Sequence, residues 1–249
     1  MFFVKNEQYI DWKKWKKFQF GYPTCGTLFS LRLEIGQLLR EKVSILEVGY
    51  GSGELLGFLT SLGKDVTGVE RNQELVRIGR ECGFNVFEGN PWDISEISDK
   101  RFDLIIALAV AEHMEFEELV RFFSWSRDHL SESGTLFLKF PEGSSPFGLG
   151  YQNGDFTHRS CLTKRKIEAL CPMTKMTLVS YSDERLVSNR LCSFGIIGQV
   201  LLLALHLYSA TLKLLVRAIF LPVYPELSLA TNSISLIRPQ HLVEKDEAA

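Results

Sequence analysis

The sequence predicts an α/β fold in which a mostly parallel β-sheet carries helices on both faces. Three observations lead to this prediction. Short apolar runs alternate with segments of helical periodicity from residue 43 to residue 140. The first run is followed by three glycines at alternate positions, as in a tight turn between a strand and a helix. The run 102–110 is almost continuously apolar, which is typical of a central parallel strand buried on both faces.

The composition is that of an ordinary globular protein. The chain has 249 residues, 45% of them hydrophobic and 23% charged, which allows one large domain with elaborations. A net charge of −2 argues against a broad nucleic-acid-binding surface, so no nucleic-acid partner is predicted. The cysteines form no Cys-x-x-Cys pair, and no disulfide framework or metal site is predicted. Because the N-terminus lacks the pattern of a secretory signal, we expect a cytoplasmic protein.

Residues 1–41 are predicted to form a helical cap. In segment 7–20, a helix would place two tryptophans and a phenylalanine on one side and four lysines on the other. Two interpretations stay open, since the aromatic side can pack on the core or the basic side can attract anionic headgroups or an anionic substrate. A second helix over 27–41 is predicted to lead into the first strand.

The first strand contains Glu47 near its end, and Gly49, Gly51 and Gly53 follow in the sequence Glu-Val-Gly-Tyr-Gly-Ser-Gly. Glycines at these positions let backbone N–H groups and a helix N-terminus approach a polar or anionic ligand. The spacing departs from the Gly-x-Gly-x-x-Gly fingerprint of dinucleotide-binding loops, because Glu54 stands where that fingerprint needs glycine. The pattern therefore disfavours a dehydrogenase, and a tight turn without a ligand is the alternative.

An acidic residue followed by Gly-x-Gly-x-Gly resembles motif I of the class I S-adenosylmethionine (SAM) methyltransferases. The resemblance implies a Rossmann-like sheet of seven mostly parallel strands, SAM as the cofactor, and a role for Glu47 in placing the cationic amino-acid end of SAM. Glu70 ends the second strand about 20 positions beyond the turn, where an acidic residue reaches ribose hydroxyls in doubly wound folds. The cofactor-binding residues predicted are Glu47, Gly49, Tyr50, Gly51, Gly53, Glu70, Arg71, Asn90, Pro91, Trp92, Ala107 and Ala109.

The turn Gly89-Asn-Pro-Trp-Asp93 after the third strand is assigned to the adenine of SAM. The family often has Gly-Asp here, and Asn90 takes the place of that aspartate. Its carbonyl oxygen can accept a hydrogen bond from the adenine amino group. Trp92 either stacks on the base or fills the core, and the sequence leaves this open.

After the fourth strand the chain reads Ala111-Glu-His-Met114, which resembles the segment that closes over SAM near the methyl group in many methyltransferases. The segments 140–148 and 152–158 resemble a stretch of methyltransferases from bacterial cell-surface polysaccharide and O-antigen gene clusters. The resemblance spans roughly residues 9–238 and implies methylation of a glycan or a lipid-linked glycan. Glu142 departs from the asparagine that is common in these relatives.

The loop 141–158 follows the fifth strand, at the edge where open α/β sheets place substrates. O-methylation of a sugar hydroxyl needs its oxygen in line with the methyl group and a group that takes its proton. We predict that His158 is the general base, that Asp155 orients it, and that His113 is the second candidate. The alternative is that both histidines hold the loop through hydrogen bonds to the backbone.

Four segments are predicted along the chain, namely the cap, a SAM-binding core over 42–185, an apolar helical insertion over 186–225, and the last strand with a polar tail over 226–249. Residues 194–212 contain no Asp, Glu, Lys or Arg, a length that permits a membrane span. Spanning is disfavoured because the last strand must return to the same sheet. We expect 194–221 to contact the membrane interface or a substrate lipid, with packing in the core or in a homodimer as the alternative.

Two other functions stay open at this point. The apolar insertion would also suit a methyltransferase for a small lipid or quinone-like acceptor. The second alternative is a SAM-binding subunit without catalytic activity in a membrane-associated polysaccharide assembly complex. In each case we expect a cytoplasmic protein with peripheral contact at the inner face of the cytoplasmic membrane.

Overall fold

The computed structural model describes residues 13, 19–39, 44–184, 195–220, 228, 230–241 and 243, and all structural statements below concern these residues. The helices of five or more residues are α2 (Cys25–Ile35), α3 (Glu54–Ser61), α4 (Gln73–Glu81), α5 (Phe116–His129), α6 (Leu149–Gly154), α7 (Lys164–Met173) and α9 (Gly195–Phe220). The strands are β1 (Ser44–Val48), β2 (Asp65–Glu70), β3 (Val86–Glu88), β4 (Phe102–Leu108), β5 (Leu130–Pro141), β6 (Met176–Asp183) and β7 (Asn232–Pro239). Short 3-10 helices η2 (Pro91–Asp93), η3 (Ser95–Ile97) and η4 (Ala111–His113) lie between them.

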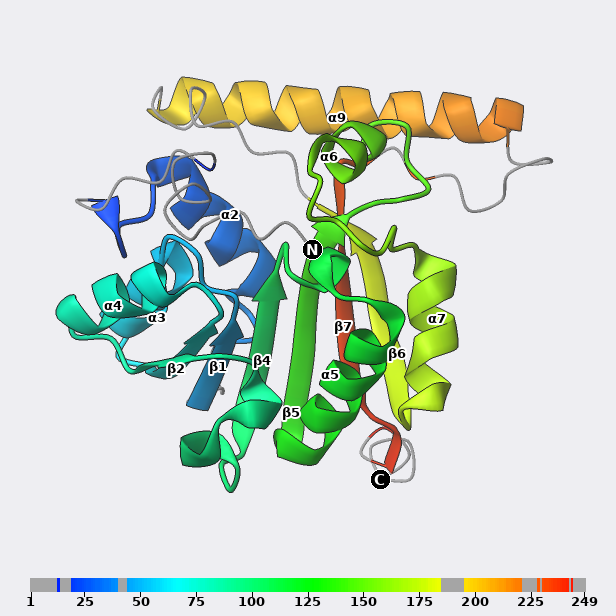
Figure 1. Ribbon diagram of the computed structural model, residues 1–249. Helices are drawn as coiled ribbons and strands as arrows, with labels where there is room; N and C mark the ends of the chain where they lie inside the picture. The colour runs from blue at the N-terminus through cyan, green and yellow to red at the C-terminus, as the bar shows by residue number, and fades with distance from the viewer. Residues whose placement is uncertain are drawn as a thin grey trace.

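The strands form one seven-stranded sheet in the order β3-β2-β1-β4-β5-β7-β6 (Figure 1). Strands β1 to β5 pair in parallel, and β7 runs antiparallel to both of its neighbours, β5 and β6. This confirms the predicted Rossmann-like sheet of seven mostly parallel strands. Its topology brings the carboxyl ends of β1, β2 and β4 to one edge, which is where such sheets bind ligands.

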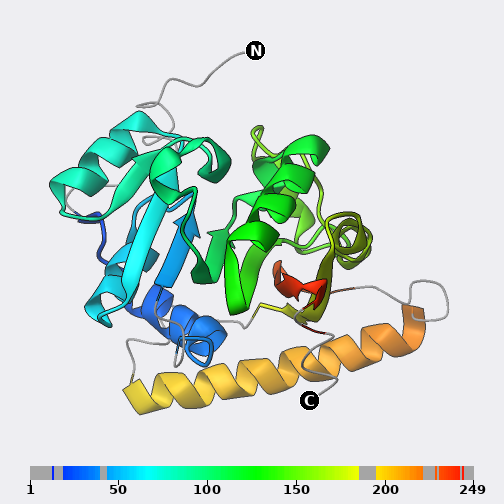
Figure 2. The same ribbon diagram turned by 90° about the horizontal axis from the view of Figure 1, so that it is seen from below.

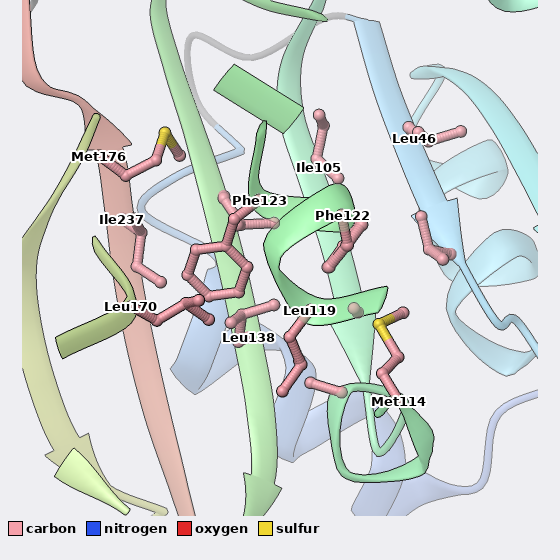
Figure 3. Packing of buried hydrophobic residues seen from close by; sticks show 14 of the residues in the cluster. Leu46, Ile105, Met114, Leu119, Phe122, Phe123, Leu138, Leu170, Met176 and Ile237 are labelled. Carbon is pink, nitrogen blue, oxygen red and sulfur yellow. The ribbon is translucent and has the colours of Figure 1, made fainter. Parts of the chain in front are cut away.

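Helices cover both faces of the sheet, because successive side chains of a buried strand point to opposite faces. Leu46 of β1 and Ile105 of β4 pack in the cluster that includes Phe122 of α5 (Figure 3). Their neighbours Ile45 and Ile106 pack on the other face, in a cluster with residues of α2, α3 and α4. Burying each such side chain contributes about 1.5–3 kcal/mol. The core therefore fixes the two central strands from both sides.

Strand β5 begins at Leu130 and includes residues 131–134, ahead of its apolar run. Leu130 pairs with Phe102, and the register shifts between Phe102 and Leu104, so that the irregular stretch stays within the ladder. The helix predicted over 27–41 ends at Ile35. The predicted helix 7–20 lies outside the described residues except for residues 13, 19 and 20.

Glu142 fixes the start of the loop that follows β5. Its side chain is fully buried and accepts hydrogen bonds from the backbone N–H of Ser144 (3.0 Å), from Ser233 Oγ of β7 (2.5 Å) and from the hydroxyl of Tyr181 on β6. A buried carboxylate is stable only when its oxygens are satisfied in this way. The residue that departs from the family pattern is thus a link between the loop and the antiparallel end of the sheet.

Helix α9 lies along the outside of the molecule, next to α2 (Figures 1 and 2). Its large apolar side chains are exposed at positions Ile197, Val200, Leu201, Leu203, Leu205, Leu207, Tyr208, Leu212, Leu214, Leu215 and Ile219. At about 100° per residue they cover roughly 200° of the helix circumference. Within the described part of the chain, no helix meets the length and apolarity needed to cross a bilayer.

Candidate active site

The turn between β1 and α3 has three glycines in the left-handed region, with φ of 70° at Gly49, 51° at Gly51 and 72° at Gly53. Side chains are also excluded sterically. A Cβ on Gly49 would lie 2.5 Å from Cγ2 of Val110, and one on Gly53 would lie 2.7 Å from the ring of Phe20. The turn therefore needs glycine for its conformation and for the close approach of the segment after β4.

Glu70 lies across from this turn at the end of β2. Its Oε2 accepts a hydrogen bond from the backbone N–H of Gly51 (3.2 Å), and its Oε1 accepts from the N–H groups of Arg71 (2.8 Å) and Asn72 (3.0 Å). Burial raises the pKa of Glu70, and these three N–H groups oppose the rise. A carboxylate held at this place retains acceptor capacity for the hydroxyls of a ribose.

Glu47 is the second carboxylate at this edge of the sheet. Its side chain is 3% exposed, and Oε2 has no hydrogen-bond partner among the described residues. Burial raises its pKa well above the usual value, and the negative charge of Glu70 raises it further. A cationic ligand group nearby would compensate this buried carboxyl. Glu47 and Glu70 therefore fit the ammonium and ribose groups of SAM beside the glycine turn.

Three of the residues assigned to the cofactor lie with their side chains in the core. The Tyr50 ring packs edge-on to Phe20 at a centroid distance of 6.2 Å, and its buried hydroxyl has no partner among the described residues. Gly68 leaves room for this ring, because a Cβ there would lie 2.8 Å from Tyr50 Cδ1. Ala107 and Pro91 are also buried. Their side chains therefore contribute to the core rather than to a ligand surface.

Three more of the residues assigned to the cofactor follow strands β2 and β3, namely Arg71, Asn90 and Trp92. The guanidinium of Arg71 donates to Asn90 Oδ1 (2.6 Å) and to Glu118 of α5 (2.7 Å). Arg71 thus bonds to the carbonyl oxygen of Asn90 that was assigned to the adenine amino group. Trp92 is partly buried against the core, with the guanidinium of Arg121 5.1 Å from its ring centre.

Ala109 follows β4 and has a φ of 53°, which is uncommon for a residue other than glycine. Its N–H donates to the carbonyl oxygen of Lys139 on β5 (2.8 Å). This bond ends the parallel pairing of β4 and β5 and turns the chain into η4. The strained turn thereby brings Glu112 and His113 to the carboxyl edge of the sheet.

Glu112 and His113 of η4 meet Asp155 and His158 of the loop after α6, and we call these four residues the acceptor-side cluster. The rings of His113 and His158 are in edge contact at a centroid distance of 4.7 Å. His158 Nε2 lies 3.7 Å from Asp155 Oδ2 and 3.9 Å from Glu112 Oε1. The structure thus brings together all three residues that were predicted to be catalytic.

Both histidine rings are held by the loop backbone through Nδ1. His158 Nδ1 lies 3.0 Å from the carbonyl oxygen of Gln152, and His113 Nδ1 lies 3.2 Å from that of Thr157. A carbonyl oxygen only accepts, so Nδ1 carries the proton in each neutral ring and Nε2 keeps its lone pair. His158 is therefore oriented by Gln152, and Asp155 faces its other nitrogen. Burial, with the neighbouring His158, lowers the pKa of His113 to about 4.

Asp155 is the carboxylate of the cluster that both hydrogen bonds and an ion pair hold in place. Its Oδ1 accepts from the N–H of Thr157 (2.8 Å), and its Oδ2 pairs with the ammonium of Lys13 (3.0 Å). Burial alone would raise the pKa of Asp155, but the hydrogen bonds from Thr157 and Lys13 lower it below the usual value. Lys13 therefore contributes a charged contact to this site.

Glu112 is the residue of the cluster that the sequence reasoning did not select. Its side chain is fully buried, and its carbonyl oxygen accepts from the N–H groups of Arg159 (2.8 Å) and Ser160 (2.9 Å). Burial raises the pKa of its carboxyl to about 8. The available signal was its position beside His113 in the same motif. With two imidazole lone pairs and two carboxyl groups, the cluster can take a proton from a hydroxyl or hold a cation.

A family model described as a methyltransferase domain matches residues 22–186, which is more than half of the chain. The structure is similar to that of a SAM-dependent methyltransferase from Archaeoglobus fulgidus, with a TM-score of 0.62 and 15% identity over 92% of this chain and 98% of that chain. It is also similar to the plantazolicin methyltransferase BpumL, solved with a triazolic desmethylPZN analog and SAH, with a TM-score of 0.55 and 16% identity over 93% and 91% of the chains. For the mycolic acid cyclopropane synthase CmaA1, solved with SAH and CTAB, the TM-score is 0.53 and the identity 14% over 85% and 82%. No curated protein matches the chain in sequence.

Proposed function

The chain belongs to the family of SAM-dependent methyltransferases, and from this premise we propose that it methylates a sugar hydroxyl of a cell-surface glycan or lipid-linked glycan. The observation that carries the proposal is the acceptor-side cluster, at the edge of the sheet that also holds the glycine turn. An oxygen acceptor must lose a proton during methyl transfer, and this cluster has the groups to take it. The resemblance of the loop 141–158 to polysaccharide-linked methyltransferases supports the choice of a sugar.

The chain's own residues perform positioning and proton removal in this proposal. When bound, SAM supplies a methyl group on a positively charged sulfur. The backbone of Gly49 and Gly51 and the carboxylates of Glu47 and Glu70 bind and orient the cofactor. The loop that carries His158 binds the acceptor on the other side, and the cluster removes the proton from the attacking hydroxyl. Holding the two reactants in line provides much of the rate enhancement.

The proposal predicts that the protein transfers label from methyl-labelled SAM to a lipid-linked glycan fraction. The labelled glycan is hydrolysed, and mass spectrometry then identifies the sugar and the oxygen that carry the methyl group. The matched control is a reaction with the Glu70→Ala variant, which lacks the ribose contact. Label in a small lipid or quinone fraction instead would favour the alternative acceptor. SAM binding without transfer to any fraction would contradict the enzymatic proposal.

We further propose that the exposed apolar face of α9 contacts the membrane interface and brings the enzyme to a lipid-linked acceptor. The face covers roughly half of the circumference, and its described side chains include no charge. Exposed apolar surfaces of this extent usually bind a membrane or another protein. A helix that lies flat in the headgroup region buries about half of its surface in lipid, which is the extent of this face.

Replacing Leu207 and Leu214 with glutamate is expected to weaken binding to phosphatidylethanolamine and phosphatidylglycerol vesicles by about 10²–10⁴-fold, because each leucine contributes about 1.5–3 kcal/mol when buried. Cosedimentation measures this binding, and both side chains are exposed, so the fold should persist. The control is Met173→Glu, an equally exposed apolar position on α7. If the double variant sediments with vesicles as well as the wild type and Met173→Glu do, the proposal is contradicted. A wild-type dimer that the double variant converts to monomer would favour α9 as a subunit interface.

A further inference from the structure

Three side chains of the acceptor-side cluster have the arrangement of a metal site. Glu112, His113 and His158 each bring one ligand atom to a common place, and these atoms all lie within 4.8 Å of one another. They come from η4 and from the loop after α6, more than 40 positions apart in the chain. No sequence spacing indicates such a site, which is why none was predicted.

The hydrogen bonds of the two imidazoles are those of metal ligands. A ligating histidine donates the N–H of its other ring nitrogen to a carbonyl or carboxylate, which fixes its tautomer and orientation. His158 does so with the carbonyl oxygen of Gln152 (3.0 Å), and His113 with the carbonyl oxygen of Thr157 (3.2 Å). Both Nε2 atoms consequently keep a lone pair for a cation, and the ligand atoms of the three residues lie within 4.8 Å of one another.

Glu112 supplies an independent observation. Its side chain is 0% exposed, and neither carboxylate oxygen has a hydrogen-bond partner among the described residues. A buried carboxylate without a partner is costly unless a positive charge compensates it. Lys13 pairs with Asp155 (3.0 Å), and its charge lowers the pKa of Glu112 without offsetting the larger effect of burial. The backbone carbonyl of Glu112 accepts from the N–H groups of Arg159 and Ser160, which holds η4 against the loop that carries His158.

We propose that Glu112, His113 and His158 bind one divalent transition-metal ion, with Zn²⁺ as the ion that best suits two imidazoles and a carboxylate. Three protein ligands leave a coordination position for an oxygen of the acceptor. Asp155 stays outside this set, because Lys13 and Thr157 already occupy its oxygens.

The ion gives the acceptor-side cluster a defined role in the proposed reaction. A hydroxyl bound to a divalent ion loses its proton near neutral pH, and the proton passes to water. The resulting oxygen takes the methyl group from the sulfonium of SAM, which leaves as the neutral thioether. His158 then acts as a ligand rather than as the base predicted from the sequence. This catalytic role rests on the function proposed above, whereas the binding of the ion does not.

Metal content after incubation with Zn²⁺ and dialysis tests the site directly. The untagged wild-type protein should retain about one Zn²⁺ per chain, and Glu112→Gln and His113→Ala should each lower the affinity by at least roughly 100-fold. The control is His241→Ala, an exposed histidine outside the cluster. Retention of Zn²⁺ by all four proteins would mean an adventitious surface ion and would overturn the proposal, as would its absence from the wild type.

The melting temperature provides a second measurement that does not depend on activity. Zn²⁺ should raise the melting temperature of the wild type and of His241→Ala but not that of Glu112→Gln. Without metal, Glu112→Gln should melt at the same or a higher temperature than the wild type, since glutamine is neutral whereas a buried glutamate must keep a proton to stay uncharged. A lower melting temperature for this variant without metal would contradict the inference. Zinc binding without methylation of any glycan would leave the metal site standing and refute only the proposed function.

Discussion

Replacing His158 with asparagine is expected to lower the rate of methyl transfer by about 10²–10⁴-fold. The loss follows whether Nε2 takes the proton itself or holds the ion that activates the hydroxyl, because asparagine cannot supply that lone pair. The asparagine amide can still donate to the carbonyl oxygen of Gln152, which now accepts from Nδ1. The substitution therefore separates the chemical role of His158 from its role in holding the loop.

The measurement is single-turnover methyl transfer at saturating SAM, together with SAM affinity by calorimetry. We expect SAM affinity to remain within about twofold of the wild type, since His158 belongs to the acceptor side. His158→Ala serves as the comparison, because it removes the bond to Gln152 as well and should also lower the melting temperature. Turnover close to normal in a folded His158→Asn variant would exclude a catalytic role for this residue.

Replacing Gly49 with alanine is expected to weaken SAM binding by at least tenfold and to lower stability by about 3 kcal/mol. A left-handed φ costs an alanine about 1–2 kcal/mol, and its Cβ would lie 2.5 Å from Cγ2 of Val110. Relief of that contact must displace either the cofactor turn or the segment that leads to Glu112. The effect should therefore reach both halves of the site.

Gly63→Ala is the matched control for this substitution. Gly63 has a φ of 71°, close to the 70° of Gly49, but a Cβ there meets no atom within 4 Å. Gly63→Ala should lower stability only by the cost of the left-handed conformation, about 1 kcal/mol. Its SAM affinity should stay that of the wild type. Adding Val110→Ala to Gly49→Ala should restore part of the loss, as measured by urea unfolding and calorimetry. If Gly49→Ala matches Gly63→Ala in both measurements, the close approach of Val110 has no energetic importance.

The sequence predicted the sheet well because local patterns determine its central strands. Glu47, Glu70 and the glycine turn could be located because β1 and β2 are short strands whose ends follow directly from the apolar runs. The side chain of Tyr50 could not be placed in this way. Its burial depends on Gly68, which leaves space for the ring only after β2 has paired with β1.

The contacts within the acceptor-side cluster could not be predicted from local sequence patterns either. His113 and His158 were predicted as separate candidates, but their contact depends on the path of the loop after β5. That path is fixed by the buried Glu142 and by backbone bonds from Arg159 and Ser160 to Glu112, none of which leaves a local pattern. The start of β5 at Leu130 likewise depends on tertiary structure, since it rests on the pairing of Leu130 with Phe102.

The position of β7 has a consequence for biosynthesis. The last strand of the chain lies between β5 and β6, so neither neighbour has its antiparallel partner until residue 239 has left the ribosome. Before that, the nascent chain exposes an unpaired strand edge together with the apolar helix α9. Such species recruit chaperones or aggregate. This half of the sheet can therefore close only after β7 has been synthesised, and early contact of α9 with a lipid surface would protect the chain until then.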